Sequence, residues 1–177
     1  ALGKLAGAKT GDGTGDNNIS IGLYSGNALS SGFRNIFIGR CAGRITTTGA
    51  DNIFLGRDAG ETNTEGKFNI AIGHYALCGG PLTGCHNIVM GHYAAHDMTS
   101  GNKNVVIGCC VNVASASGSC QLAIGAGTNY WLQGDSSFDL VTNNIVPSSN
   151  NSKNLGSDAT RWANVYTNDL QLSNKGK

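Results

Sequence analysis

The chain has 177 residues, of which 40% are hydrophobic, 13% are charged and 27 are glycine. A formal net charge of +1 provides neither the basic stripe of a nucleic-acid-binding protein nor an acidic tail. The sequence has no apolar run of about 18 residues and no charged leader before an apolar stretch. We therefore expect neither nucleic-acid binding nor membrane insertion. No signal peptide is visible in this stretch, and a leader that was removed or that precedes residue 1 is left open.

Residues 1–14 are expected to be the remnant of a preceding repeat. Residues 3–7 read Gly-Lys-Leu-Ala-Gly, and residues 39–43 read Gly-Arg-Cys-Ala-Gly. The array is therefore expected to start before residue 1, with further repeats or another module on that side.

Residues 15–129 carry a 17-residue repeat that ends in Asn-Ile-x-Ile-Gly or a close variant of it. The closing glycines of the seven copies are Gly22, Gly39, Gly56, Gly73, Gly91, Gly108 and Gly125. A second glycine lies seven positions earlier in every copy, and we expect it to mark a turn with positive φ. Such regular spacing predicts a protein of stacked repeats.

The segments between the glycines favour short β-strands. They are rich in Ile, Val and Phe, and three to five residues are too few for a stable helix. We predict an all-β fold, a parallel β-solenoid or β-roll of about seven coils, each with about two strands and two turns. The Asn column four positions before the closing glycine is predicted to form a ladder of amide hydrogen bonds.

Alternation along the strand assigns side chains to two faces. Side chains one and three positions before the closing glycine are predicted to face the inside of the coil. The predicted core residues of the first of these columns are Ile21, Ile38, Leu55, Ile72, Met90, Ile107 and Ile124.

The column two positions before the closing glycine then faces outward, and six of its seven residues are apolar. An apolar stripe on the outside of a rod calls for a partner, and identical chains about an axis would bury it. We therefore predict a homo-oligomer, with Phe37, Phe54, Ala71, Val89 and Val106 as its interface residues. The alternative is that the chain's own turn residues cover this stripe.

From about residue 130 the repeat stops. Residues 130–177 are predicted to form a small non-repeat β module that caps the array, because an open coil end exposes unpaired backbone groups.

The phrase Asn-Ile-Ala-Ile-Gly-x-x-Ala at residues 69–76 resembles two related repeats. One is the head repeat of trimeric autotransporter adhesins, a left-handed β-roll built by three chains, and the other occurs in bacteriophage tail fibres. The repeat here is longer than the usual adhesin repeat. The stretch from Leu155 to Asn174 is similar to the segment before the intramolecular chaperone of phage tail fibres and spikes, which guides trimer assembly and then cuts itself off.

The resemblance implies a structural and adhesive segment of a phage tail fibre, located in the virion. It would be a rigid homotrimeric rod that supports or presents binding to a host cell-surface receptor, with a glycan as one option. The alternative is the head of a trimeric adhesin on the bacterial cell surface. Six cysteines, which would hinder export if they paired, and the absence of apolar heptads near the C-terminus count against it.

A polysaccharide-degrading tail spike is a further alternative, and it would need paired acids in a groove. The two glutamates, Glu61 and Glu65, fall in one predicted turn without the spacing of a glycosidase pair. No Gly-x-Ser-x-Gly nucleophile elbow occurs, and His92 and His96 would share a face only on a helix. We therefore predict no enzyme, no catalytic or metal-binding residue and no cofactor.

The positions just after the closing glycines predict one vertical patch of polar and aromatic side chains. It consists of Arg40, Arg57, His74, Tyr75, His92 and Tyr93. Aromatic rings beside hydrogen-bonding groups suit sugar rings, so glycan contact is one hypothesis and a solvated face is the other.

The six cysteines contain no Cys-x-x-Cys pair, which argues against a zinc ribbon. We expect buried, reduced thiols that behave as small apolar residues. The alternative is a disulfide between Cys78 and Cys85, which bracket the one 18-residue repeat.

Overall fold

The structure is a computed structural model, and it describes residues 1–8, 15–137 and 140–142. These residues belong to the first of two compact units, Ala1–Asn143. Most of the predicted cap, including the stretch 155–174, lies outside the described residues. The same holds for residues 9–14 of the predicted N-terminal remnant.

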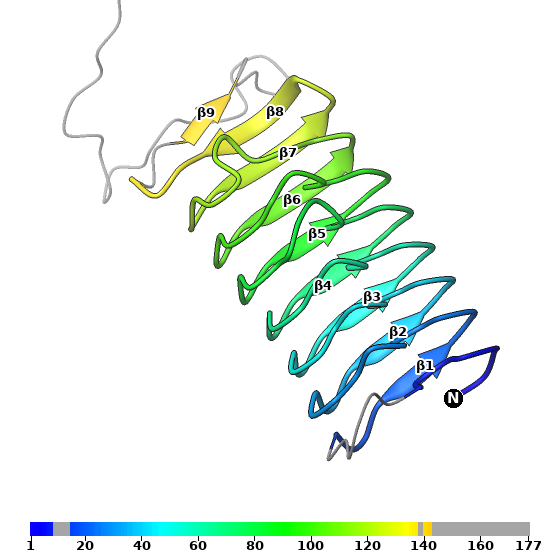
Figure 1. The fold of residues 1–177 in the computed structure, drawn as a ribbon. Coiled ribbons are helices and arrows are strands. Elements are labelled where there is room, and N and C mark those ends of the chain that lie inside the picture. Colours follow the sequence, from blue (N-terminus) through cyan, green and yellow to red (C-terminus); the bar gives the residue numbers. More distant parts are fainter. Residues whose placement is uncertain (9–14, 138–139, 143–177) are drawn as a thin grey trace, which may run out of the picture. The chain divides into compact units, whose positions relative to one another are not determined.

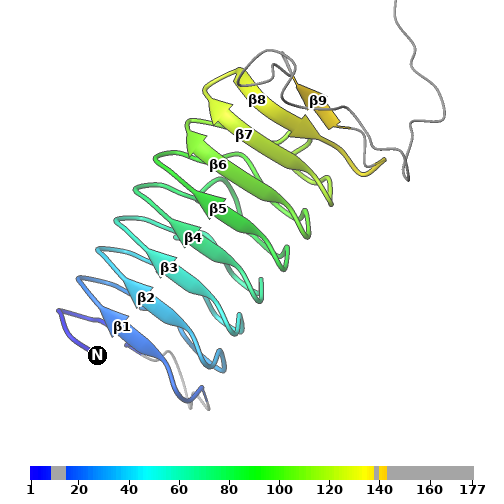
Figure 2. The ribbon, with the colours of Figure 1, turned by 180° about the vertical axis from the view of Figure 1, so that it is seen from behind.

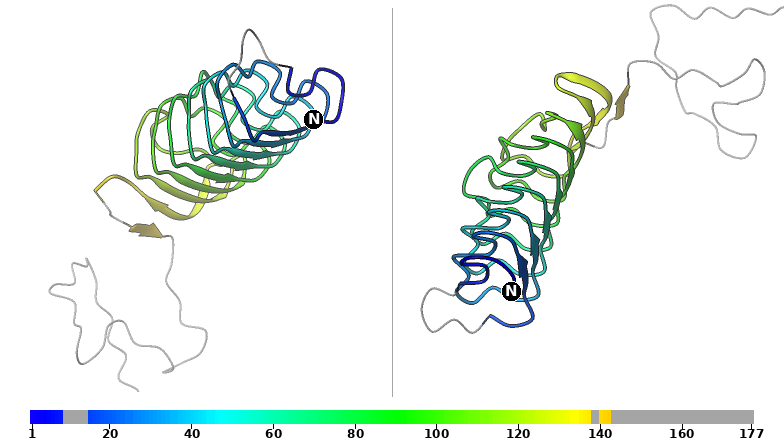
Figure 3. Two further views of the ribbon diagram at one scale, coloured as in Figure 1. Left: turned by 90° about the horizontal axis from the view of Figure 1, so that it is seen from below. Right: turned by 90° about the vertical axis from the view of Figure 1, so that its right-hand side faces the viewer.

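In the part of the chain that the structure describes, nine strands form one sheet whose spatial order follows the sequence (Figure 1). The strands are β1 (Ile19–Ile21), β2 (Ile36–Ile38), β3 (Ile53–Leu55), β4 (Ile70–Ile72), β5 (Ile88–Met90), β6 (Val105–Cys109), β7 (Leu122–Ala126), β8 (Asn129–Gly134) and β9 (Leu140–Thr142). Strands β1 to β7 pair in parallel, each residue opposite its equivalent in the next repeat. The prediction of an all-β parallel solenoid with coils of about 17 residues is confirmed, and the described residues contain no helix (Figures 2 and 3).

Both ends of the array extend the same sheet. Residues 1–8 lie on the first coil, where the Leu2 amide donates a 2.8 Å hydrogen bond to the Ser20 carbonyl. At the other end β8 pairs antiparallel with β7, and β9 pairs antiparallel with β8. The change of direction occurs near residue 129, where the repeat stops.

Each coil has one strand rather than the predicted two. The small residues three positions after the closing glycine, such as Ala42, Ala59 and Ala76, are buried in turns. Backbone hydrogen bonds still join the coils there, for example from the Gly43 amide to the Ala59 carbonyl at 3.0 Å. The backbone ladder therefore continues through the turns without forming a second sheet.

The prediction of which strand face lies inside was wrong. The column assigned to a trimer interface fills the interior of its own coil: Phe37, Phe54, Ala71, Val89 and Val106 are all 0% exposed. The column assigned to the core lies on the outer face of the sheet. Its members are exposed or partly exposed: Ile21, Ile38, Leu55, Ile72, Met90, Ile107 and Ile124.

The physical reason is that the coil interior is narrow. Its volume is shared between the strand column two positions before the closing glycine and the turn column four positions after it. Phe37 and Phe54 stack with ring centroids 5.2 Å apart. Beside each ring is a glycine, and a Cβ on Gly60 would meet the Phe54 ring at 2.5 Å. One coil further on the sizes are exchanged, because Ala71 is followed six positions later by the buried Leu77. A strand face with two large aliphatic side chains would overfill this space.

The predicted Asn ladder is confirmed, and it lies inside the coil. Asn52 Nδ2 donates to Asn35 Oδ1 at 3.0 Å and to the Gly66 carbonyl at 2.8 Å. The backbone amide of Asn69 donates to Asn52 Oδ1 at 3.0 Å, which carries the ladder to the next coil. Each side-chain amide thus satisfies buried backbone groups that would each cost about 1–3 kcal/mol if left unpaired.

The two columns require glycine, but not for the reason that the sequence predicted. The earlier glycine of each repeat does not have positive φ; a Cβ on Gly32 would instead meet the Gly49 carbonyl oxygen of the next coil at 2.4 Å. The closing glycines from Gly22 to Gly108 have the positive φ, for example 135° at Gly39, where a Cβ would also clash with Gly56, whereas Gly125 does not. Close stacking of coils therefore requires glycine in both columns.

We predict that the interior sizes can be exchanged between coils. Phe54→Ala should lower the free energy of unfolding by about 3–5 kcal/mol because it leaves a cavity. Gly60→Leu alone should also destabilise, but the double variant rebuilds the Ala71/Leu77 arrangement and should be more stable than either single variant. Urea denaturation followed by circular dichroism measures this. Phe33→Ala, at a partly exposed ring, is the control, and simple addition of the two single effects would contradict the prediction.

Candidate functional site

The outer face of the parallel sheet is a continuous aliphatic surface. Each strand from β1 to β7 places two aliphatic side chains on it, at one and three positions before the closing glycine. Ile38 is 39% exposed and Met90 is 40% exposed, and neither column contains a polar or charged residue. Parallel sheets are normally covered on both faces. In the described residues this face of β1 to β6 has no cover (Figure 2).

A second surface runs along the edge where the chain leaves each strand. The predicted patch residues lie here side by side, one coil apart. Tyr75 and Tyr93 have ring centroids 4.6 Å apart, and His74 and His92 have centroids 5.3 Å apart. Arg57 Nη2 donates to the Tyr75 hydroxyl at 3.2 Å, which joins the arginines to the aromatic rings. The structure therefore brings together the patch that the repeat spacing predicted.

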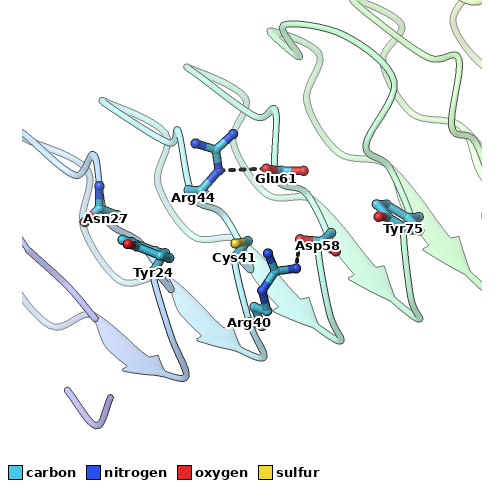
Figure 4. Close-up of a pocket in the computed structure, with 8 residues that line it drawn as sticks. All are labelled: Tyr24, Asn27, Arg40, Cys41, Arg44, Asp58, Glu61 and Tyr75. Atoms are coloured by element: carbon cyan, nitrogen blue, oxygen red, sulfur yellow. Dashed lines mark hydrogen bonds and ion pairs between the residues drawn. The ribbon is translucent and has the colours of Figure 1, made fainter. Parts of the chain in front are cut away.

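This edge contains a shallow hollow of about 430 Å³ (Figure 4). Its lining residues are Tyr24, Asn27, Arg40, Cys41, Arg44, Asp58, Glu61 and Tyr75. Tyr24 and Tyr75 lie at its two ends, with the charged side chains between them. Of the predicted patch only Arg40 and Tyr75 line the hollow.

Sequence reasoning missed the other lining residues because it did not follow the column two positions after the closing glycine through all coils, or the column five positions after it. Arg44 and Glu61 are 17 residues apart, and so are Cys41 and Asp58, which places each pair at equivalent positions of adjacent coils. Opposite charges at that spacing were a usable signal for a contact between coils. The two glutamates do not form an acid pair, because Glu65 is exposed and does not line the hollow.

The acids of the hollow are neutralised by arginines. Asp58 is 3% exposed; its Oδ1 lies 3.7 Å from Arg40 Nη1 and its Oδ2 lies 3.0 Å from Arg57 Nε. Glu61 Oε1 accepts a 2.7 Å hydrogen bond from Arg44 Nε. The Arg57 contact lacks hydrogen-bond alignment, so one Asp58 oxygen is buried without a hydrogen bond. The hollow thus presents donors and aromatic rings rather than free carboxylates.

All six cysteines, each within the described residues, are free thiols. The expectation of buried thiols holds for Cys41, whereas Cys109 and Cys110 are exposed and the others are intermediate. Burial raises the pKa of Cys78 to about 11, so this thiol is protonated at neutral pH. Cys78 and Cys85 are not joined by a disulfide in the structure.

Comparison with models of known protein families, with curated proteins and with solved structures gave no significant match. None of the described residues forms a helix of the length and apolarity that crossing a membrane requires.

We predict that His74 titrates below the ordinary histidine range. Burial lowers its pKa, and the positive charge of Arg57 lowers it further. The imidazole should therefore stay neutral as the pH falls past about 6.5 and take up its proton only below that value. NMR titration of the ring resonances measures the midpoint. In Arg57→Gln the midpoint should rise but stay below the ordinary value, because burial remains; a wild-type midpoint at or above 6.5 would contradict this.

Proposed function

We propose that this chain is a structural segment of a phage tail fibre that assembles as a rigid homotrimeric rod and supports binding to a host-cell receptor. The observation that carries the proposal is the uncovered aliphatic face of the parallel sheet. No catalytic activity is part of the proposed function.

The aliphatic face argues for assembly because of its extent. It continues without a charged side chain over seven coils, and its side chains are rigid parts of a hydrogen-bonded sheet. A contiguous apolar surface of this kind normally marks an interaction site. Covering it would remove many partly exposed Ile, Leu, Val and Met side chains from water, which stabilises by about 25 cal/mol for each Å² buried.

The repeat itself favours other copies of this chain as the cover. The aliphatic side chains recur once per coil, at a spacing of about 4.8 Å along the stack. A partner that contacts the whole face in register needs the same spacing, and an identical stack beside it provides that spacing. Closed cyclic symmetry would bury the face in every copy and leave no open apolar edge for further growth.

Two features support a phage fibre over a bacterial adhesin head. The stretch 155–174 is similar to the segment before a phage intramolecular chaperone, and the exposed pair Cys109 and Cys110 is poorly suited to export through an oxidising compartment. An adhesin head on the bacterial surface remains the alternative, and a heptad stalk with a membrane anchor in the same polypeptide would favour it.

The tyrosine-flanked hollow is the proposed site of receptor contact. Tyr24 and Tyr75 offer ring faces, while Arg40, Arg44 and Asn27 offer donors between them. Sugar rings combine apolar faces with hydroxyl groups, and this arrangement suits both. Three copies of the hollow on one rod would bind a repeating glycan with higher avidity than a single chain.

We predict a solution mass three times the 18.2 kDa chain mass by light scattering in reducing buffer. Ile38→Lys/Ile107→Lys should reduce the mass to that of one chain without altering the circular dichroism spectrum. Both side chains are on the outer face, so the coils themselves should tolerate the charges.

The control is Thr48→Lys/Ser117→Lys, which adds the same charge at exposed turn positions and should leave the mass unchanged. A folded wild-type protein with the mass of one chain would refute assembly. Twice the chain mass would replace the trimer with face-to-face pairing.

We predict that the assembled protein binds a host surface glycan through the hollow. On an array of bacterial surface oligosaccharides, Tyr24→Ala and Tyr75→Ala should each weaken binding at least tenfold, because each removes a stacking face. Trp131→Ala removes an exposed aromatic ring outside the hollow and should have no effect. Binding that is insensitive to both tyrosines would exclude this site.

A further inference from the structure

A cluster of one imidazole and two thiols lies on the surface at the end of strand β6. His92 follows the closing glycine of one repeat, and Cys109 occupies the same position one coil later, 17 residues on. Cys109 Sγ lies 3.8 Å from His92 Nδ1 and 3.3 Å from Cys110 Sγ, and all three side chains are exposed. The three ligand atoms lie within 4.8 Å of one another.

We propose that His92, Cys109 and Cys110 bind a Zn²⁺ ion, with two thiolates and one imidazole as ligands. Zn–S bonds of about 2.3 Å and Zn–N bonds of about 2.0 Å in a tetrahedron place sulfurs about 3.8 Å apart and sulfur and nitrogen about 3.6 Å apart. Two of the three observed separations, 3.3 and 3.8 Å, differ from these by half an ångström or less, and the third pair, His92 and Cys110, lies within 4.8 Å. Small side-chain rotations are therefore enough to bind the ion.

The backbone explains why two adjacent cysteines reach the same point. Neighbouring residues in a strand point to opposite faces, but β6 ends at Cys109 and Cys110 has a left-handed φ of 56°. The Cys110 amide donates a 2.7 Å hydrogen bond to the His92 carbonyl. This bond fixes the two coils in register, so the ligands are preorganised by the stack.

The ligand set points to a thiophilic divalent ion. Two thiolates and an imidazole are typical zinc ligands and disfavour Mg²⁺ and Ca²⁺, which prefer oxygen. On binding, the two thiols release their protons to solvent. The residue paired with Cys109 in the next coil is Ala126, which offers no ligand, so water would complete the tetrahedron.

The described residues contain one other cluster of possible ligands, and it is a poorer site. Cys41, Asp58 and Glu61 also lie close together among the described residues. Arg40 and Arg57 already contact the Asp58 carboxylate, and Arg44 contacts Glu61. A cation there would have to displace these arginines, whereas His92, Cys109 and Cys110 have no cationic partner among the residues that the structure describes.

The test uses the full chain with all thiols reduced, under anaerobic conditions, with Co²⁺ as the spectroscopic probe and Zn²⁺ as competitor. One equivalent of Co²⁺ should give thiolate-to-metal charge-transfer bands and the intense visible bands of tetrahedral cobalt, and Zn²⁺ should abolish them. His92→Gln, Cys109→Ser and Cys110→Ser should each weaken binding at least about tenfold.

Two control variants replace a cysteine and a histidine outside the proposed site and leave its three ligands unchanged. Cys120→Ser changes another cysteine with left-handed φ, 58° against 56° at Cys110, and His96→Gln changes a nearby histidine outside the cluster. Both should bind cobalt as the wild type does. The proposal is overturned if the reduced wild type shows no tetrahedral spectrum, or if the spectrum persists in all three ligand variants. Loss of binding after oxidation to a Cys109–Cys110 disulfide, and its return on reduction, would support the assignment.

Discussion

The stacking of each coil on the next at a fixed register is the constraint on which the other features of this protein depend. Backbone hydrogen bonds join each coil to the next, both in the strands, where equivalent residues lie opposite one another, and in the turns between them. The buried Asn column extends the same pattern, because each amide accepts from the next coil and donates to a carbonyl beside it. A change in register would leave these buried groups unpaired, so the repeat length can vary only where a turn absorbs the difference. The 18-residue repeat does so while β4 and β5 remain in register.

A narrow interior follows from this stacking and decides which side chains can lie inside. Glycine is needed where the next coil's carbonyl lies against a residue's Cα, as at Gly32 and Gly39. The remaining interior volume is filled by complementary sizes, with Phe54 beside Gly60 and Ala71 beside Leu77. The two aliphatic columns of each strand, one and three positions before the closing glycine, are therefore directed outward. In the proposed assembly their hydrophobic contribution stabilises the contact between chains rather than a single coil.

The same geometry creates sites from residues that are far apart in the sequence. Positions 17 residues apart become neighbours, so Arg44 meets Glu61, and His92 meets Cys109. The tyrosine-flanked hollow and the His–Cys–Cys cluster lie on the same edge, just after the strands, because the chain there turns through left-handed residues that direct side chains outward. Arginines already pair with the carboxylates of the hollow and so exclude a metal cation. In the described residues no arginine or lysine pairs with the cluster near β6. One edge of the stack thus contains a hollow of hydrogen-bond donors and aromatic rings and, separately, a cluster of metal-ligating side chains.

The sequence alone determined the repeat, the all-β class, the parallel stack, the Asn ladder and the row of residues that follows the closing glycines. Each depends on spacing, which a stack converts directly into contact. Only the tertiary structure decided which strand face lies inside, because alternation gives two faces without saying which is the interior. Two features of the sequence indicate the inner face. Asn52 and Phe54 lie two positions apart and share a face, and an amide ladder needs burial. The large Phe54 is followed six positions later by the small Gly60, and the small Ala71 by the large Leu77, which is typical of one shared interior volume. The structure also decided that Cys109 and Cys110 converge, since that depends on where β6 ends and on the left-handed φ of the next residue.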